Sequence, residues 1–166
     1  MAPRFPLYLN LENAPCLVVG GGSVATRRVE TLMRCGAKVR CIAPAFSEAL
    51  VALAAAEPMN CGGLELVDRP FRETDIGHWR LAVAATDQKD VNKNVASLCV
   101  KSNIPVSVAD APELSSFFFP GLVVRGELSV GICTNGASPS TSKQIREIIE
   151  MVLPEDLGDR IAEASR

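Results

Sequence analysis

The sequence lacks the features that mark membrane, secreted or nucleic-acid-binding proteins. No apolar run is long enough to cross a membrane, and the start, MAPRFPLYLN, contains no apolar segment of a secretory signal. The formal net charge of the 166 residues is −2, so bulk charge does not favour a nucleic-acid partner. We therefore expect a cytoplasmic protein with no membrane or nucleic-acid partner, in which local basic patches can still bind an acidic small molecule.

Metal-ligand patterns are also missing from the sequence. His78 is its only histidine, and no two of the six cysteines form a C-x-x-C pair. Several cysteines lie in apolar runs, so buried free thiols in a reducing compartment are the favoured interpretation. We therefore predict no resident zinc or iron–sulfur centre. The cysteines are Cys16, Cys35, Cys41, Cys61, Cys99 and Cys133.

Short apolar runs alternate with helical patterns over the first two thirds of the chain. Hydrophobic residues make up 48 % and charged residues 22 % of the sequence, which is enough apolar material for a packed core. The patterns predict strands over residues 14–20, 37–43, 64–67, 80–85 and 104–109, and helices over residues 23–35, 48–56 and 88–102. This alternation predicts an α/β fold with a Rossmann-like, doubly wound parallel sheet.

The pattern changes after residue 113. Extended segments on either side of Gly126 predict an antiparallel hairpin. Ser138 or Ser140 can cap a helix that runs to about residue 152, and the polar tail beyond it predicts a further short helix. We therefore expect two parts, a dinucleotide-binding domain over residues 1–113 and a hairpin-and-helix segment over residues 114–166.

Residues 20–25, GGGSVA, match the pattern G-x-G-x-x-A. They follow a predicted strand and open a predicted helix, which is the context that a dinucleotide-binding fingerprint requires. Gly20 permits a tight turn, Gly22 lets the backbone approach a pyrophosphate, and Ala25 allows close helix–sheet packing. The helix start offers free N–H groups to the phosphates. A glycine turn without a ligand is the less favoured alternative, and a P-loop is excluded because no Gly-Lys-Ser/Thr follows.

The second predicted strand ends without the acidic residue that usually binds the ribose of a dinucleotide. It runs instead into Ile42, Ala43, Pro44 and Ala45. This position therefore does not discriminate NAD from NADP. Arg40 lies nearby in the sequence, and a solvated side chain is its favoured interpretation.

Polar residues follow the fourth and fifth predicted strands. Ligands of doubly wound sheets bind beyond the carboxyl ends of the strands, so Thr86 or Asp87 can contact the ribose. Capping of the helix over residues 88–102 is an equally good interpretation, and one residue can do both. Asp110 can act as a general base beside a nicotinamide, although the residues alone slightly favour a turn-forming aspartate before Pro112.

Taken together, these motifs resemble one family. The residues that carry the resemblance are 6–9, 19–25, 27–28, 84–87, 92, 110–114, 119–120 and 135–139. In combination they are similar to the precorrin-2 dehydrogenase family, which forms the N-terminal module of siroheme synthase. The resemblance covers about residues 3–153.

The resemblance implies NAD-dependent oxidation of precorrin-2 to sirohydrochlorin, a tetrapyrrole, in a homodimer joined by the hairpin segment. By position, Ser23 and Val24 contact the dinucleotide together with Pro44 and Ala45, and Asp110 matches the catalytic aspartate. Asp110 can take the proton that accompanies hydride loss, or hold the ring system in place.

The carboxylates of a tetrapyrrole call for basic partners. The candidates are Arg125, Lys143 and Arg146. For each of them considered alone, a solvated surface charge is the favoured interpretation over a substrate contact.

Two alternatives stay open at this point. Some members of the family also insert ferrous iron, so the chain can be a bifunctional dehydrogenase and ferrochelatase. It ends at Arg166, whereas typical members continue into a further helical region, so an NAD-binding accessory subunit that needs a partner is the second alternative. Residues 140–143 are polar where the family usually has an apolar helix start, and residues 57–63 resemble a small insertion.

Overall fold

The computed structural model describes residues 4–56, 62–135 and 138–164. The chain divides into two compact units, Leu9–Phe118 on the one hand and Met1–Tyr8 with Phe119–Arg166 on the other. The division of function after residue 113, between cofactor binding and dimerisation, stays a prediction.

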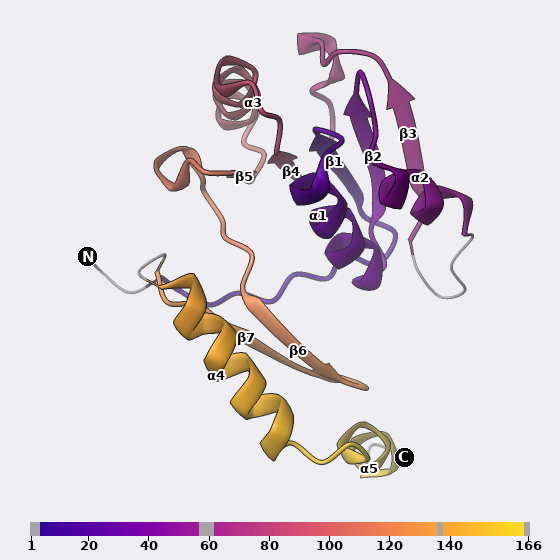
Figure 1. Cartoon of the computed structure of the whole chain (residues 1–166), viewed down its shortest axis with the longest axis vertical. Coiled ribbons are helices and arrows are strands. Elements are labelled where there is room, and N and C mark those ends of the chain that lie inside the picture. The colour runs from indigo at the N-terminus through magenta and orange to yellow at the C-terminus, as the bar shows by residue number, and fades with distance from the viewer. Residues whose placement is uncertain (1–3, 57–61, 136–137, 165–166) are drawn as a thin grey trace. The chain divides into compact units, whose positions relative to one another are not determined.

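A five-stranded parallel sheet forms the centre of the Leu9–Phe118 unit (Figure 1). Its strand order is β3-β2-β1-β4-β5, and every neighbouring pair is parallel. The predicted strands and the α/β, doubly wound fold class are confirmed, with small shifts at the strand ends. The strands are β1 (Pro15–Val19), β2 (Lys38–Ala43), β3 (Leu64–Asp68), β4 (Leu81–Ala84) and β5 (Val106–Val108).

The chain builds this sheet outward from β1 in two directions. It runs through α1 (Ser23–Arg34), β2 and α2 (Glu48–Ala55) to β3, and then returns to the other side of β1 to form β4, α3 (Lys89–Lys101) and β5. Because parallel crossovers are right-handed, α1 and α3 cover opposite faces of the sheet. The strand order therefore reverses between β1 and β4, and ligands of such sheets bind beyond the carboxyl ends at this point.

The core fixes the strand ends from which the candidate site begins. Leu17 and Val19 of β1 are buried, and they pack in one cluster with Val95 and Cys99 of α3. Burying each such apolar side chain contributes about 1.5–3 kcal/mol relative to exposure. All four residues of β4 are buried as well, as expected of a strand covered on both faces.

The predicted helix boundaries in this unit are confirmed at two positions. Gly36 has a φ of +81° and ends α1, and its N–H donates to the carbonyl oxygen of Met33 at 2.8 Å. The Ser47 hydroxyl caps α2 by accepting from Leu50 N at 3.3 Å. Two short 3₁₀ turns, Glu73–Asp75 and Pro112–Leu114, were not predicted. Among the described residues no helix combines the length and the apolar character that crossing a bilayer requires.

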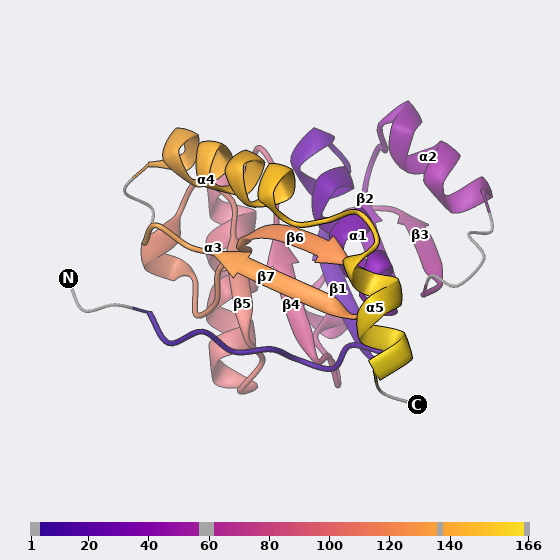
Figure 2. The same ribbon diagram turned by 90° about the horizontal axis from the view of Figure 1, so that it is seen from below.

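The other unit contains an antiparallel hairpin and two helices (Figure 2). The hairpin strands β6 (Gly121–Arg125) and β7 (Leu128–Ile132) confirm the predicted hairpin, and Gly126 in its turn has a φ of +56°. The helix α4 (Pro139–Val152) packs against β6 and β7 and is capped by Ser138, whose hydroxyl accepts from Thr141 N at 3.2 Å. The predicted tail helix is α5 (Leu157–Ala164).

Candidate functional site

The glycine turn lies where β1 passes into α1. Gly20 has a φ of +130°, and a Cβ atom there would lie 2.2 Å from the Ala85 carbonyl oxygen. At Gly21 a Cβ atom would lie 2.0 Å from the Ala45 carbonyl oxygen. Gly22 differs, because no atom of the described residues lies within 4 Å of its Cβ position. The packing of the protein therefore requires the first two glycines, whereas Gly22 borders open space in which a ligand can reach the backbone.

The start of α1 offers unpaired amides beside this open space. The first intrahelical hydrogen bond runs from Thr26 N to the Gly22 carbonyl oxygen at 3.0 Å, so the amides of Ser23, Val24 and Ala25 precede it. Gly22 has no side chain to cap them, and the first turn contains no acidic residue. These amides and the positive end of the helix dipole suit a pyrophosphate. Ala25 itself is fully buried, as close packing on the sheet requires.

The loop after β2, which includes the exposed Pro44 and Ala45, is tied to the glycine turn. Ser47 N donates to the Gly21 carbonyl oxygen at 2.8 Å, and the hydroxyls of Ser47 and Thr26 lie 2.9 Å apart. These hydrogen bonds join the loop to the glycine turn, so the positions predicted to bind the dinucleotide lie next to one another. The contacts of Thr26 and Ser47 with the turn were not predicted, because their partners are set by the tertiary structure.

A buried thiol on β2 stabilises the same turn. The Cys41 Sγ donates to the Gly20 carbonyl oxygen at 3.1 Å, and Gly20 N donates to the Ile42 carbonyl oxygen at 2.9 Å. Burial raises the pKa of Cys41 to about 12, so the thiol keeps its proton and can donate at neutral pH. This cysteine therefore stabilises the turn instead of reacting.

The ends of β1, β4 and β5 lie in register, which brings three of the sequence motifs to one edge. Val19 pairs with Ala84, and Ala84 pairs with Val108. The next residues along each strand lead into the glycine turn, into Thr86 and Asp87, and into Asp110, respectively. The structure therefore places the predicted pyrophosphate, ribose and catalytic positions on three neighbouring strands.

Thr86 and Asp87 play different parts in the loop between β4 and α3. Gln88, and neither of these two residues, occupies the N-cap position of α3. The Thr86 hydroxyl accepts from Gln88 N at 3.1 Å and donates to Asn92 Oδ1 at 2.7 Å, so it is engaged within the protein. The Asp87 side chain is exposed and has no hydrogen bond or ion pair to any described residue, which leaves its carboxylate available to a ligand. Its contact with a ribose stays a prediction.

Asp110 stands at the end of β5 in an unusual backbone conformation. Its φ is +56°, in the left-handed region, where residues other than glycine are uncommon. The side chain is exposed, and among the described residues its carboxylate has no hydrogen-bonding or ion-pairing partner. Ala109 and Asp110 form a turn, as the turn-forming interpretation predicts, and the exposed carboxylate of Asp110 stays accessible to a ligand. The structure thus offers Asp110 as an acid or base at the edge of the sheet.

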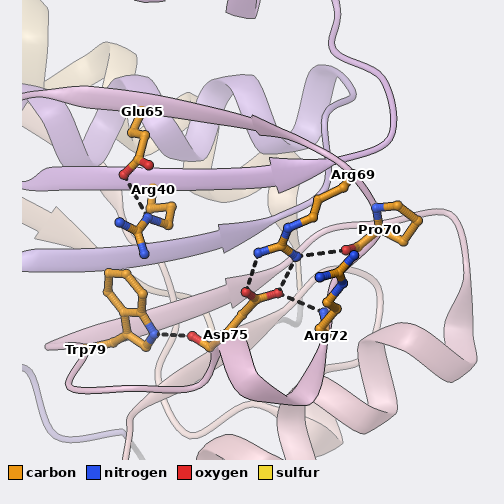
Figure 3. A network of polar contacts seen from close by, with 7 residues as sticks. All are labelled: Arg40, Glu65, Arg69, Pro70, Arg72, Asp75 and Trp79. Atoms are coloured by element: carbon orange, nitrogen blue, oxygen red, sulfur yellow. Dashed lines mark hydrogen bonds and ion pairs between the residues drawn. The ribbon is translucent and has the colours of Figure 1, made fainter.

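A polar network closes the corner beyond β3 (Figure 3). The Asp75 carboxylate accepts from both terminal nitrogens of Arg69, at 2.6 and 2.8 Å, and from Arg72 N at 2.7 Å. The Arg69 guanidinium holds the pKa of Asp75 below its ordinary value. Trp79 Nε1 donates to the Asp75 carbonyl oxygen at 2.8 Å, so the loop from β3 to β4 is closed on itself.

Arg40 is held within the same corner. Its Nε lies 2.7 Å from Glu65 Oε2, and its guanidinium carbon lies 5.6 Å from the centre of the Trp79 ring (Figure 3). The side chain is about half exposed, at 46 %. Its partners are therefore protein groups in addition to the solvent that the sequence favoured.

The basic candidates of the second unit are also engaged. The Arg125 guanidinium donates to the carbonyl oxygens of Val124 and Glu150, at 3.1 and 3.4 Å. Arg146 pairs with Glu150 at 2.7 Å, and Lys143 lies 3.7 Å from a carboxylate oxygen of Glu147 on the same helix. Over the part of the chain that the structure describes, no group of three or more histidine, cysteine or acidic side chains is arranged to hold a metal ion.

Together, the strand order, the open Gly22 and the free amides of α1 define a dinucleotide-binding α/β protein. A family model described as putative NAD(P)-binding matches residues 7–121. The chain belongs to this NAD(P)-binding family, and the resemblance inferred from the sequence motifs is confirmed by its relatives.

Two of these relatives are siroheme synthases. The protein of Thioalkalivibrio sulfidiphilus is 38 % identical over 154 residues, which cover 93 % of this chain and 30 % of the relative. The protein of Methylococcus capsulatus is 39 % identical over 153 residues, which cover 92 % of this chain and 31 % of the relative. The chain thus spans about a third of the length of these relatives.

A solved structure described as SirC, precorrin-2 dehydrogenase, has the same fold. It superposes with a TM-score of 0.76 at 29 % sequence identity, and the match covers 94 % of this chain and 74 % of that one.

Proposed function

We propose that this chain oxidises precorrin-2 to sirohydrochlorin with NAD, as a step of siroheme biosynthesis. The observation that carries the proposal is the exposed Asp110 carboxylate, which has no partner among the described residues and lies two strands from the open glycine turn at one sheet edge. The family membership supports a nicotinamide cofactor, and the name of the solved relative SirC supports the substrate.

The reaction divides between the cofactor and the residues of the edge. NAD, when bound, supplies the acceptor for the hydride. The amides of Ser23, Val24 and Ala25 hold the pyrophosphate, and Asp87 accepts hydrogen bonds from a ribose hydroxyl. Asp110 takes the proton that the substrate releases in addition to the hydride, so two electrons and two protons leave the tetrapyrrole, two electrons and one proton to NAD as the hydride and one proton to Asp110.

The charges around the end of β2 favour NAD over NADP. The segment from Pro44 to Glu48 contains no basic residue, and Glu48 lies in the first turn of α2. Arg69 lies beside the end of β2, since its backbone N–H donates to the Ala43 carbonyl oxygen at 3.1 Å, but its guanidinium is paired with Asp75. A 2′-phosphate there meets the carboxylate of Glu48 and no basic residue of the 44–48 segment, so NADP should bind more weakly than NAD.

The test is an anaerobic assay with purified protein, precorrin-2 and NAD, followed by NADH absorbance. Asp110→Asn should lose about 100-fold or more in turnover, since a general base typically contributes 10²–10⁴-fold, and it should bind NAD unchanged. Glu113→Gln is the matched control, because Glu113 is an exposed acid in the next turn, and it should behave as wild type. Equal turnover of both variants would remove Asp110 from the reaction.

Two further measurements distinguish the dehydrogenase from an accessory subunit and from a ferrochelatase. Tight NAD binding with no NADH formation by the protein alone, and NADH formation once a second tetrapyrrole enzyme is added, would identify an accessory subunit. The absorption band of siroheme after mixing with sirohydrochlorin and ferrous iron, in the absence of NAD, would add ferrochelation to the redox step.

We further propose that the chain forms a homodimer through the second unit. Helix α4 exposes Ile148 at 54 %, Met151 at 78 % and Val152 at 74 %, and a two-stranded sheet by itself is marginally stable in water. Light scattering should give a dimer mass for the wild type and a monomer mass for Ile148→Asp. Gln144→Asp, which adds the same charge at an exposed polar position of α4, should stay dimeric; a monomeric wild type would contradict the proposal.

A further inference from the structure

One polar side chain in the first unit is buried for a reason that the proposed reaction does not explain. Asn92 is only 6 % exposed, within the second turn of α3. Its Oδ1 accepts from Thr86 N at 3.1 Å and from the Thr86 hydroxyl at 2.7 Å, and its Nδ2 donates to the Thr86 carbonyl oxygen at 3.0 Å. A single amide thus holds the backbone and the side chain of one residue.

The residue that Asn92 holds is packed against the glycine turn. Ala85 N donates to the Val19 carbonyl oxygen at 2.8 Å, which continues the β1–β4 ladder to this point. A Cβ atom on Gly20 would lie 2.2 Å from the Ala85 carbonyl oxygen and 3.1 Å from Thr86 N. The Thr86 peptide therefore lies against the glycine turn at the point where the strand order reverses, and Asp87 follows it directly.

The position of the Thr86 peptide in the sheet assigns it to one half of the dinucleotide. With the pyrophosphate at the glycine turn, the adenosine ribose of a bound dinucleotide lies over the end of β2. The nicotinamide half then extends to the other side of β1, over the ends of β4 and β5. Thr86 and Asp87 follow β4, so they lie on the nicotinamide side of the pyrophosphate.

We infer that Asn92 is a positioning residue for the nicotinamide half of the cofactor. This inference rests on the proposed binding of NAD. By fixing both backbone groups of Thr86, Asn92 holds the loop in its binding conformation before the ligand arrives. Without this amide the loop has to be ordered during binding, and the apparent affinity falls with the fraction of molecules in the competent conformation.

The experiment compares two ligands on two variants. Calorimetric titrations of NAD and of ADP are made with wild type, Asn92→Ala and Asn94→Ala. Asn94 lies on the same helix and is exposed, with no hydrogen bond to a described residue, so its variant is the matched control. ADP contains the adenosine and the diphosphate but lacks the nicotinamide half.

Asn92→Ala should bind NAD about 10-fold more weakly or worse and bind ADP within about 3-fold of wild type, since only the competent fraction of one loop has changed. Asn94→Ala should match wild type for both ligands. An equal loss of NAD and ADP affinity in Asn92→Ala, or no loss at all, would overturn the inference. Failure of the wild type to bind NAD would instead refute the proposed function.

A second variant serves if Asn92→Ala does not fold. Thr86→Val removes the hydroxyl, and with it the hydrogen bonds to Asn92 Oδ1 and from Gln88 N, and it keeps the two hydrogen bonds between Asn92 and the Thr86 backbone. This variant should weaken NAD binding by about 3-fold, because it removes a smaller part of the network than Asn92→Ala, and it should leave the affinity for ADP unchanged. Unchanged affinity for NAD, or an equal loss for ADP, would contradict the positioning role.

Discussion

Replacing Gly22 by alanine should separate folding from cofactor binding. Gly22 has a φ of −85° and a ψ of −172°, which alanine adopts without strain, and the described residues leave its Cβ position free. Alanine restricts the unfolded chain, which stabilises by about 0.4–1 kcal/mol, but it is a poorer N-cap than glycine by a similar amount. The two effects oppose each other, so the free energy of unfolding should change by less than about 0.5 kcal/mol.

NAD affinity should respond much more strongly than stability. The added methyl group occupies the space through which a pyrophosphate reaches the amides of Ser23 and Val24. Losing one hydrogen bond to a charged group costs about 1.5–3 kcal/mol, which corresponds to about 10- to 100-fold weaker binding. Urea unfolding gives the stability of Gly22→Ala, and calorimetric titration with NAD gives its affinity.

Gly21→Ala is the control for this experiment. Its Cβ atom would lie 2.0 Å from the Ala45 carbonyl oxygen, so the turn has to shift, and overpacking of this kind costs about 1–3 kcal/mol. Gly21→Ala should therefore lose stability together with affinity. A Gly22→Ala protein that binds NAD as tightly as wild type would refute the placement of the pyrophosphate, and one that is strongly destabilised would refute the open space at Gly22.

Three further predictions concern stability. Asp75→Asn should lower the free energy of unfolding by about 1 kcal/mol at neutral pH. Because Arg69 lowers the pKa of Asp75, this difference between wild type and variant is present above the ordinary aspartate pKa of 3.8. Urea unfolding should show that the difference shrinks as the pH falls and the carboxylate is protonated. Asp110→Asn should be as stable as wild type, whereas Asp110→Ala should lose about 1 kcal/mol in the left-handed conformation; equal melting of both variants would contradict this. Burial raises the pKa of Cys41 from 9.0 to about 12, so the folded state holds the thiol proton more tightly than the unfolded state. Above about pH 9 the free energy of unfolding of the wild type should therefore fall more steeply with pH than that of Cys41→Ala, by up to about 1.4 kcal/mol per pH unit. An equal pH dependence of the two proteins would refute the burial of a protonated Cys41.

The sheet could be predicted from the sequence because its signals are local. Continuous apolar runs such as residues 14–20 are typical of strands buried on both faces, and Gly36 marks a helix end by its own backbone conformation. The glycine fingerprint was recognisable for the same reason, since its spacing is contained in a single turn. The strand order was not predicted, because the alternation of strands and helices and the handedness of crossovers are compatible with more than one order of parallel strands.

The missed features depend on contacts between distant parts of the chain. Gly21 is required because the Ala45 carbonyl oxygen lies against it, which no local pattern reveals. The Arg69–Asp75 pair forms only when the loop after β3 folds back, and its 3₁₀ turn has no periodic signal. Asn92 belonged to the motifs that carried the family resemblance, but its role depends on Thr86 in the folded loop.

The most direct test of the account follows the backbone amides of the protein during an NMR titration with NAD. The chain of 17.7 kDa is small enough for residue-by-residue amide shifts. We expect saturable shifts at Ser23, Val24 and Ala25, together with shifts at Asp87. Saturable binding that leaves these amides unmoved, or no binding at all, would contradict the claim that the start of α1 holds the pyrophosphate.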